Sequence, residues 1–149
     1  MITFRIFGEP APQGSKRYVG NNRFIEASTK LKPWREAVKY AAIEAFENAR
    51  LFPFQKAVVV EVVFHMPKPK TVKRVWPTVP PDTDKLCRSL GDGLSVDAAV
   101  ISDDSLIVKW VATKIYSTQP GAVVRIRLAS DNDLETVLEM DLTPADYSG

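Results

Sequence analysis

The stretch PDTDKLCRSLGDGL, residues 81–94, carries two interleaved repeats with a four-residue spacing. At about 100° per residue on a helix, Asp84, Arg88 and Asp92 follow one another along one face. The opposite face carries Leu86, Leu90 and Leu94. The pattern therefore predicts a helix that buries its leucines in a core and presents its charged side chains to solvent.

Carboxylates gather on both sides of this predicted helix. Asp82 directly precedes it and can reach its charged face, and Asp103 and Asp104 follow it in VISDDSLIV. Helix capping by Asp82 and a favourable helix dipole at Asp84 would explain these two residues without any function. Alternatively, the carboxylates converge on Mg²⁺, which prefers oxygen ligands and binds a few carboxylates together with water and phosphate. Two such ions about 3.5–4 Å apart could activate a water and stabilise the leaving oxygen of a phosphodiester.

The charge of the chain is unevenly divided. The whole sequence has a net charge of +2, but residues 130–149 hold six acidic residues and no lysine or arginine, so residues 1–129 carry +8. A basic body favours a polyanionic partner, above all a nucleic acid. We therefore expect one functional domain over 1–129 and an acidic tail over 130–149.

Length and composition exclude several classes of protein. A chain of 149 residues, 45% hydrophobic and 26% charged, suits one globular domain. We expect no membrane partner, because no apolar run could span a bilayer, and the first residues lack the apolar stretch of a signal peptide. The single Cys87 fits a reducing cytoplasm. The single histidine, His65, argues against zinc chemistry built on histidines and favours a structural role.

Alternation of apolar and polar residues and runs of valine predict the other elements. Strands are expected at 1–8, 18–26 (as a hairpin), 56–66, 106–117 and 122–129, with a helix from about 33 to 49 and a short one within 134–140. The sequence QPG between the last two strands predicts a turn that joins them as a hairpin.

Two segments offer cations to a nucleic acid. The stretch PKPKTVKRVWPTVPP, residues 67–81, is too rich in proline for a helix and predicts an exposed loop. Its candidate DNA contacts are Lys68, Lys70, Lys73, Arg74 and Trp76, with Trp76 stacking on an unpaired base. In PAPQGSKR, Lys16 and Arg17 are candidate phosphate contacts. An ordinary solvated loop is the alternative for both segments.

The order of these motifs resembles the RusA-type Holliday junction resolvases. The family pattern is roughly P-D-x-D-N-L-x-K-x-x-x-D-A-L, a short variable stretch, and D-D-x-Q-V at the start of a strand. This chain has PDTDKLCRSLGDGL, then SVDAAVI, then SDDSLIV. PAPQGSKR resembles the proline-rich basic loop after the family's first strand, and Lys114 and Tyr116 resemble its Lys-x-Tyr. The resemblance extends from residue 1 to about 128.

The resemblance implies a mixed α/β (α+β) fold, in which helices pack on a small mixed sheet, and a homodimer. It implies paired nicking of four-way DNA junctions in recombination and repair, with Mg²⁺ as the cofactor and Mn²⁺ as a substitute. Such an enzyme would be cytoplasmic, bacterial or phage-encoded. The implied metal ligands and catalytic residues are Asp82, Asp84 and Asp104, with Arg88 as the catalytic cation and Asp92 and Asp103 in supporting roles.

Several positions depart from the family pattern. Lys85 replaces its asparagine, Arg88 its lysine and Leu106 its glutamine, and Asp97 has no counterpart and is interpreted as a loop residue. Arginine keeps its charge and can bind phosphate through two hydrogen bonds (bidentate binding), but it cannot act as a base. Three functions stay open: a junction resolvase, a metal-dependent nuclease for flaps or forks, and a DNA-binding module whose carboxylates only cap helices.

Overall fold

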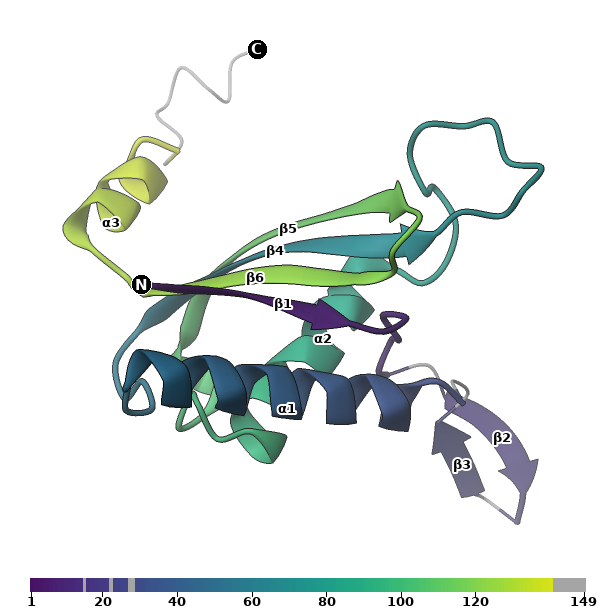
Figure 1. Cartoon of the computed structure of the whole chain (residues 1–149), viewed down its shortest axis with the longest axis horizontal. Coiled ribbons are helices and arrows are strands. Elements are labelled where there is room, and N and C mark those ends of the chain that lie inside the picture. Colours follow the sequence, from purple (N-terminus) through teal and green to yellow (C-terminus); the bar gives the residue numbers. More distant parts are fainter. Residues whose placement is uncertain (15, 22, 27–28, 141–149) are drawn as a thin grey trace.

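The computed structural model describes residues 1–14, 16–21, 23–26 and 29–140, without the side chains of 16–18 and 23–26. Its centre is a four-stranded mixed sheet in the order β1-β6-β4-β5. The helices α1 and α2 lie on one face of this sheet, and β2 and β3 form a separate hairpin (Figure 1). The architecture is α+β, which confirms the fold class predicted from the sequence.

The elements fall close to their predicted positions. They are β1 (Ile2–Phe7), β2 (Lys16–Gly20), β3 (Arg23–Glu26), α1 (Leu31–Ala49), β4 (Val58–Pro67), α2 (Thr83–Asp92), the π-helical turn η1 (Gly93–Asp97), the 3-10 turn η2 (Asp104–Leu106), β5 (Ile107–Ser117), β6 (Gly121–Leu128) and α3 (Asp131–Leu138). None of the helices in the described part of the chain is long and apolar enough to span a membrane.

The prediction that the last two strands form a hairpin is wrong. β5 and β6 lie on opposite sides of β4, which pairs in parallel with β5 and antiparallel with β6. Val59 is as fully buried as its neighbours Val58 and Val60, so β4 is apolar on both faces near its start. A strand of this kind gains most by taking the centre of a sheet, where both its edges are paired.

The loop between β5 and β6 therefore crosses the end of β4 before the chain runs back beside β1. Gly121 makes this possible. Its φ is +157°, and a Cβ at this position would lie 2.1 Å from the carbonyl oxygen of Ile6. Any larger residue would push β6 away from β1.

The leucine face of α2 is in the core, as predicted. Leu86, Leu90 and Leu94 are completely buried, together with one face of α1. The two helices approach closely where α2 continues into η1, because a Cβ at Gly93 would lie only 2.7 Å from Cγ1 of Val38. This packing fixes the rotation of α2 and so determines which of its charged side chains can meet the strand β5.

Candidate active site

Three charged side chains from two separate motifs line one pocket. Asp84 and Arg88 come from α2, and Asp104 comes from η2, immediately before β5. The pocket encloses about 380 Å³, and Trp110 of β5 forms part of its apolar lining. Gly91 lets β5 approach α2, because a Cβ there would already touch the Trp110 ring at 3.4 Å. The parallel strand β5 therefore brings the second acidic motif against the first.

Asp82 stands beside this pocket, in a separate depression. It occupies the N-cap position of α2, but within the described residues its side chain makes no capping hydrogen bond. The carboxylate is 60% exposed, and its Oδ2 lies 4.0 Å from Nζ of Lys85. Both residues line a shallow hollow with three prolines. Capping therefore does not explain Asp82, and its carboxylate is open to a ligand.

The two acidic residues before β5, Asp103 and Asp104, have different surroundings. Asp103 is the N-cap of η2 and accepts a hydrogen bond from the backbone N–H of Ser105 at 2.8 Å. Hydrogen bonds from that amide and from the Ser105 hydroxyl lower the pKa of the Asp103 carboxyl. Asp104 is the member that lines the pocket. In the sequence, only the resemblance to the family pattern separates Asp104 from Asp103.

Asp92 belongs to a hydrogen-bond network behind the pocket and does not line it. Its Oδ2 accepts a hydrogen bond from Nε2 of Gln13. The Gln13 Oε1 accepts one at 3.3 Å from Arg35, whose guanidinium also grips both oxygens of Asp97 at 2.7 and 2.9 Å. Asp97, which the sequence analysis interpreted as a loop residue, thus forms an ion pair with Arg35 of α1. Sequence reasoning missed Gln13, which has no local signal within its proline-rich loop.

Arg88 is held against the loop that follows β1. Gly14 has a φ of +99°, and a Cβ there would lie 2.9 Å from Nη1 of Arg88. Arg88 makes no ion pair with an aspartate in the described part of the chain, so its charge is directed at the pocket without being neutralised. Lys16 and Arg17 follow in β2, but their side chains lie outside the described residues.

Cys87 and His65 offer no nucleophile or base to this pocket. Burial, and then the nearby Asp84 carboxylate, raise the pKa of the Cys87 thiol to about 11, so it stays protonated. His65 alternates with the buried Phe64 and Met66 on β4 and therefore faces the other side of the sheet. Burial, and then Arg5, lower the pKa of its imidazole, as expected of a structural histidine beside an arginine.

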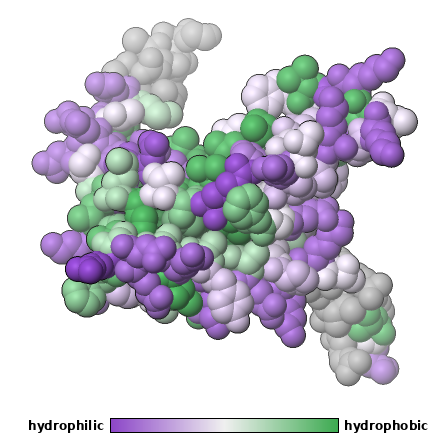
Figure 2. Space-filling model, viewed as in Figure 1, coloured by the Kyte–Doolittle hydropathy of each residue, from purple (hydrophilic) through white to green (hydrophobic). Residues whose placement is uncertain are grey.

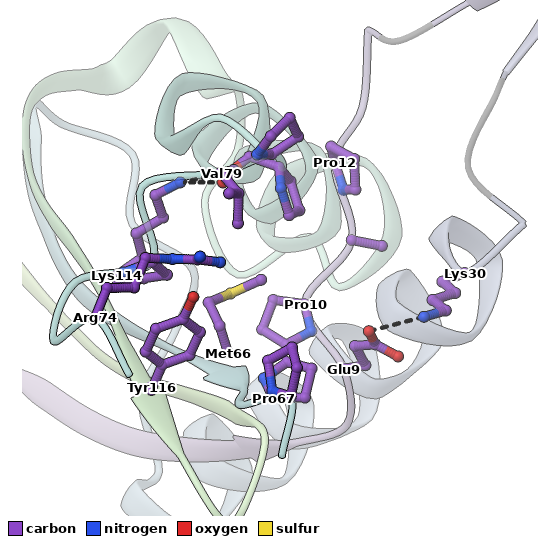
Figure 3. A pocket seen from close by; sticks show the side chains of 15 residues that line it. Glu9, Pro10, Pro12, Lys30, Met66, Pro67, Arg74, Val79, Lys114 and Tyr116 are labelled. Carbon is purple, nitrogen blue, oxygen red and sulfur yellow. Dashed lines mark hydrogen bonds and ion pairs between the residues drawn. The ribbon is translucent and has the colours of Figure 1, made fainter. Parts of the chain in front are cut away.

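The basic, proline-rich segment forms an arm between β4 and α2, residues 68–81, that extends beyond the sheet (Figure 1). Its five candidate DNA contacts, Lys68, Lys70, Lys73, Arg74 and Trp76, are all exposed. Hydrophilic side chains cover much of the arm in Figure 2. Lys114 of β5 ties its base to the sheet, donating to the carbonyl oxygens of Val79 at 2.8 Å and Pro81 at 2.9 Å (Figure 3). The arm leads directly into Asp82.

A sequence model described as endodeoxyribonuclease RusA matches residues 8–127, which hold both acidic motifs, the arm and the whole pocket. The chain belongs to the RusA family. It is also 27% identical over 141 residues to the uncharacterized protein YqaN of Bacillus subtilis (strain 168), covering 87% of this chain and 97% of that protein.

The two basic residues that depart from the RusA pattern, Arg88 and Lys85, lie in different pockets. Arg88, in the position of the family lysine, lines the pocket with Asp84 and Asp104. Lys85, in the position of the family asparagine, instead lies beside Asp82 and outside that pocket. Arg88 is therefore the basic residue that lines the same pocket as the two aspartates.

The donor set fits a hard divalent cation whose coordination is completed by substrate. Among the described residues, no three His, Cys, Asp or Glu side chains are close enough together to form a metal site. Asp84 and Asp104 nevertheless present two carboxylates to one pocket. Mg²⁺ is commonly bound by one or two carboxylates together with waters and phosphate oxygens. The structure brings two of the three expected ligands together and leaves Asp82 at the margin.

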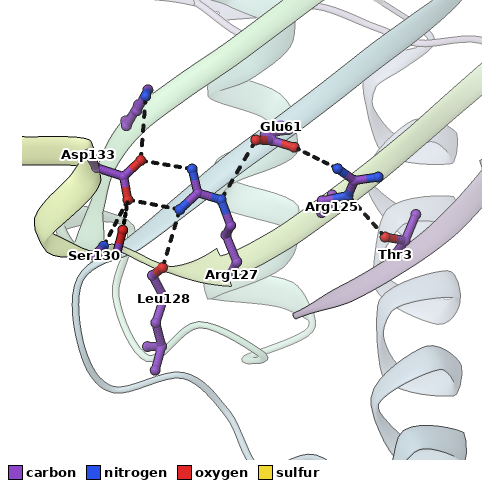
Figure 4. Close-up of polar contacts among 8 residues, drawn as sticks. Thr3, Glu61, Arg125, Arg127, Leu128, Ser130 and Asp133 are labelled. Carbon is purple, nitrogen blue, oxygen red and sulfur yellow. Dashed lines mark hydrogen bonds and ion pairs between the residues drawn. The ribbon is translucent and has the colours of Figure 1, made fainter. Parts of the chain in front are cut away.

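The RusA match ends before α3, the only described helix of the acidic tail. Asp133 accepts two hydrogen bonds from Arg127, both 2.8 Å long, and lies 3.5 Å from Lys109 (Figure 4). Hydrogen bonds from Arg127, and then from the backbone amide and hydroxyl of Ser130, hold the pKa of the Asp133 carboxyl well below its usual range. Leu134, Val137 and Leu138 are 60%, 51% and 56% exposed, so apolar packing does not hold α3 in place. Within the described residues, α3 is held to β5 and β6 through the charge of Asp133.

We expect the tail to compete with phosphate for these two cations. Removal of residues 131–149, or Asp133→Asn alone, should raise the affinity for non-specific duplex DNA at low salt. The slope of log K against log salt should steepen by about 0.9 for each cation released to a phosphate. Fluorescence anisotropy over a salt series measures both effects. Asp131→Asn is the matched control. It removes the same charge from the same helix turn, and Asp131 does not contact Arg127. A melting temperature that falls while the salt slope stays constant would contradict competition.

Proposed function

We propose that this member of the RusA family is a divalent-metal-dependent endodeoxyribonuclease that resolves four-way DNA junctions by paired nicks. The observation that carries the proposal is the convergence of Asp84, Arg88 and Asp104 on one pocket at the foot of a basic arm. Acidic side chains in a DNA-binding body repel the phosphate backbone unless a cation lies between them. The pocket combines the two requirements of phosphodiester hydrolysis, carboxylates for a metal and a fixed positive charge.

Each residue of the site has a distinct task in this proposal. Asp84 and Asp104 would hold the divalent cation, and Asp82, one residue from the arm, would complete its ligands when DNA is bound. A cation held there would supply Lewis-acid polarisation of the phosphate and an activated water. Arg88 stabilises the charge that develops on the phosphate, and it cannot take a proton from the water. The lysine and arginine side chains of the protein arm bind one branch of the DNA junction, so that the scissile phosphate enters the pocket.

A homodimer suits this substrate, because paired nicks on opposed strands need two sites related by two-fold symmetry. Both edges of β4 are paired within the sheet, so the valine-rich strand has no free edge for a partner. β5 is an edge strand and offers its outer edge along residues 107–117. A monomer mass in light scattering across micromolar concentrations, with cleavage intact, would count against a dimer.

The decisive experiment compares DNA structures under one set of conditions. End-labelled four-way junctions, flaps, forks and linear duplex are incubated with the full chain in Mg²⁺, in Mn²⁺ and in EDTA. We expect paired nicks in opposed strands of the junction that require metal. Equal cutting of flaps or forks would favour the broader nuclease. Binding to the junction with no cleavage in either metal would reduce the protein to a DNA-binding module and overturn the proposal.

A further inference from the structure

A second cavity, of about 350 Å³, lies under the basic arm and is distinct from the catalytic pocket. Met66 of β4 and Tyr116 of β5 supply side chains from the sheet (Figure 3). Six prolines, from the loop after β1 and from the arm, form much of the remaining wall. Lys114 fixes this wall through its hydrogen bonds to Val79 and Pro81, so the cavity is built into the fold.

Two polar groups of the cavity, the Tyr116 hydroxyl and the Arg74 guanidinium, have no hydrogen-bond or ion-pair partner among the described residues. The Tyr116 hydroxyl is buried and has no hydrogen-bond partner in the described part of the protein. A buried hydroxyl is costly unless something supplies a partner. The Arg74 guanidinium lies 5.8 Å from the Tyr116 ring, beside the hydroxyl in Figure 3, and pairs with no described acid. The carboxylate of Glu9, also on the wall, is already bound by Lys30 at 2.8 Å.

The chemistry of these walls fits a flat, mostly apolar ring with hydrogen-bond acceptors on its edge. A nucleobase has this character, and bases taken out of a helix are bound between apolar or aromatic side chains and by hydrogen bonds to their edges. The Arg74 guanidinium can only donate hydrogen bonds, whereas the Tyr116 hydroxyl can donate or accept, so Arg74 is the group that favours acceptors. Arginine pairs with O6 and N7 of guanine, whereas adenine presents an amino group in place of O6. The size of the cavity is at the lower end of small-ligand sites.

The position of the cavity connects it with the cleavage site. Pro80 and Pro81 line both this cavity and the hollow that holds Asp82. A strand whose phosphate reaches Asp82 would therefore pass close to this cavity. We propose that the cavity binds one unstacked base, preferably guanine, of the nucleotide beside the scissile phosphate. The inference rests on the proposed function, and it adds a source of sequence preference at the cut.

The test measures binding in EDTA, so that it does not depend on cleavage. Four-way junctions carry guanine, adenine or an abasic residue at one strand position flanking the branch point, and each flanking position is varied in turn. We expect the guanine junction to bind about 10-fold or more tightly than the abasic junction at one of these positions, the scale of a single stacked base. Adenine should be intermediate. Tyr116→Phe keeps the ring and removes one hydrogen bond to the base, so it should weaken binding of the guanine junction.

Val79→Trp should fill the cavity and remove the difference between guanine and abasic junctions. Val75→Trp is the matched control, because Val75 is on the same arm, is 80% exposed and does not line the cavity. Equal wild-type affinity for guanine and abasic junctions at every position would overturn the inference, and so would a difference that survives in Val79→Trp. Metal-dependent cleavage without base discrimination would remove this inference alone, and discrimination without cleavage would remove the resolvase function alone.

Discussion

Asp84→Asn and Asp104→Asn will each bind four-way junctions as the wild-type protein does and lose cleavage by about 10³-fold or more. Asparagine keeps the shape of the side chain and removes the charge that holds a divalent cation in the shared pocket. Loss of the metal removes both activation of water and stabilisation of the leaving oxygen, so the effect should exceed that of a single hydrogen-bond donor. Single-turnover cleavage in saturating Mg²⁺, with anisotropy for binding, measures the two quantities separately.

The adjacent aspartates provide the control. Asp103→Asn removes the same charge one residue away, but Asp103 caps η2 through Ser105 and does not line the pocket. Because asparagine is as good an N-cap as aspartate, the melting temperature and cleavage should both stay close to the wild-type values. Asp82→Asn should also lose cleavage if this carboxylate joins the metal on bound DNA. Full activity in Asp82→Asn would remove Asp82 from the ligand set, and full activity in Asp104→Asn would refute the assignment of the pocket.

Arg88→Ala will lose about 10²–10³-fold in single-turnover cleavage, the usual effect of removing one group that stabilises developing charge. Junction binding should change much less, because the arm supplies most of the phosphate contacts. Arg88→Lys should keep most of the activity, since a cation still stands one helical turn after Asp84. The loop around Gly14 packs against the Arg88 guanidinium and should hold it in place.

Lys85→Ala is the control for the position of the cation. Lys85 follows Asp84 directly, but it lies about 100° round the helix and 4.0 Å from Asp82, outside the shared pocket. Its removal should leave cleavage near the wild-type rate. If Lys85→Ala were inactive and Arg88→Ala nearly wild type, Lys85 would have taken over the role of the family lysine, and the assignment of Arg88 would be wrong.

Local sequence patterns determined the helices and strands themselves. The four-residue repeat in 81–94 is a property of the chain alone, because a helix places such residues on one face whatever surrounds it. The buried leucines of α2 follow from it, and so does the alignment of Asp84 with Arg88. The same reasoning failed for the pairing of β5 with β6. Alternation of apolar and polar residues predicts a strand but does not specify which strand pairs with it. β4, which is apolar on both faces near its start, lies between β5 and β6 and pairs with both.

Only the tertiary structure decided which carboxylates belong together. Asp92 shares a helix face with Asp84 in sequence, yet Gln13, from a loop 79 positions away, binds it behind the pocket. Asp104 reaches Asp84 because β5 runs parallel to β4 and packs Trp110 under α2. The cavity beneath the arm likewise needs Met66, Tyr116 and Lys114 from two strands that touch only in the folded sheet. Such contacts join residues far apart along the chain. Their geometry depends on how the core packs, and no short stretch of sequence contains that information.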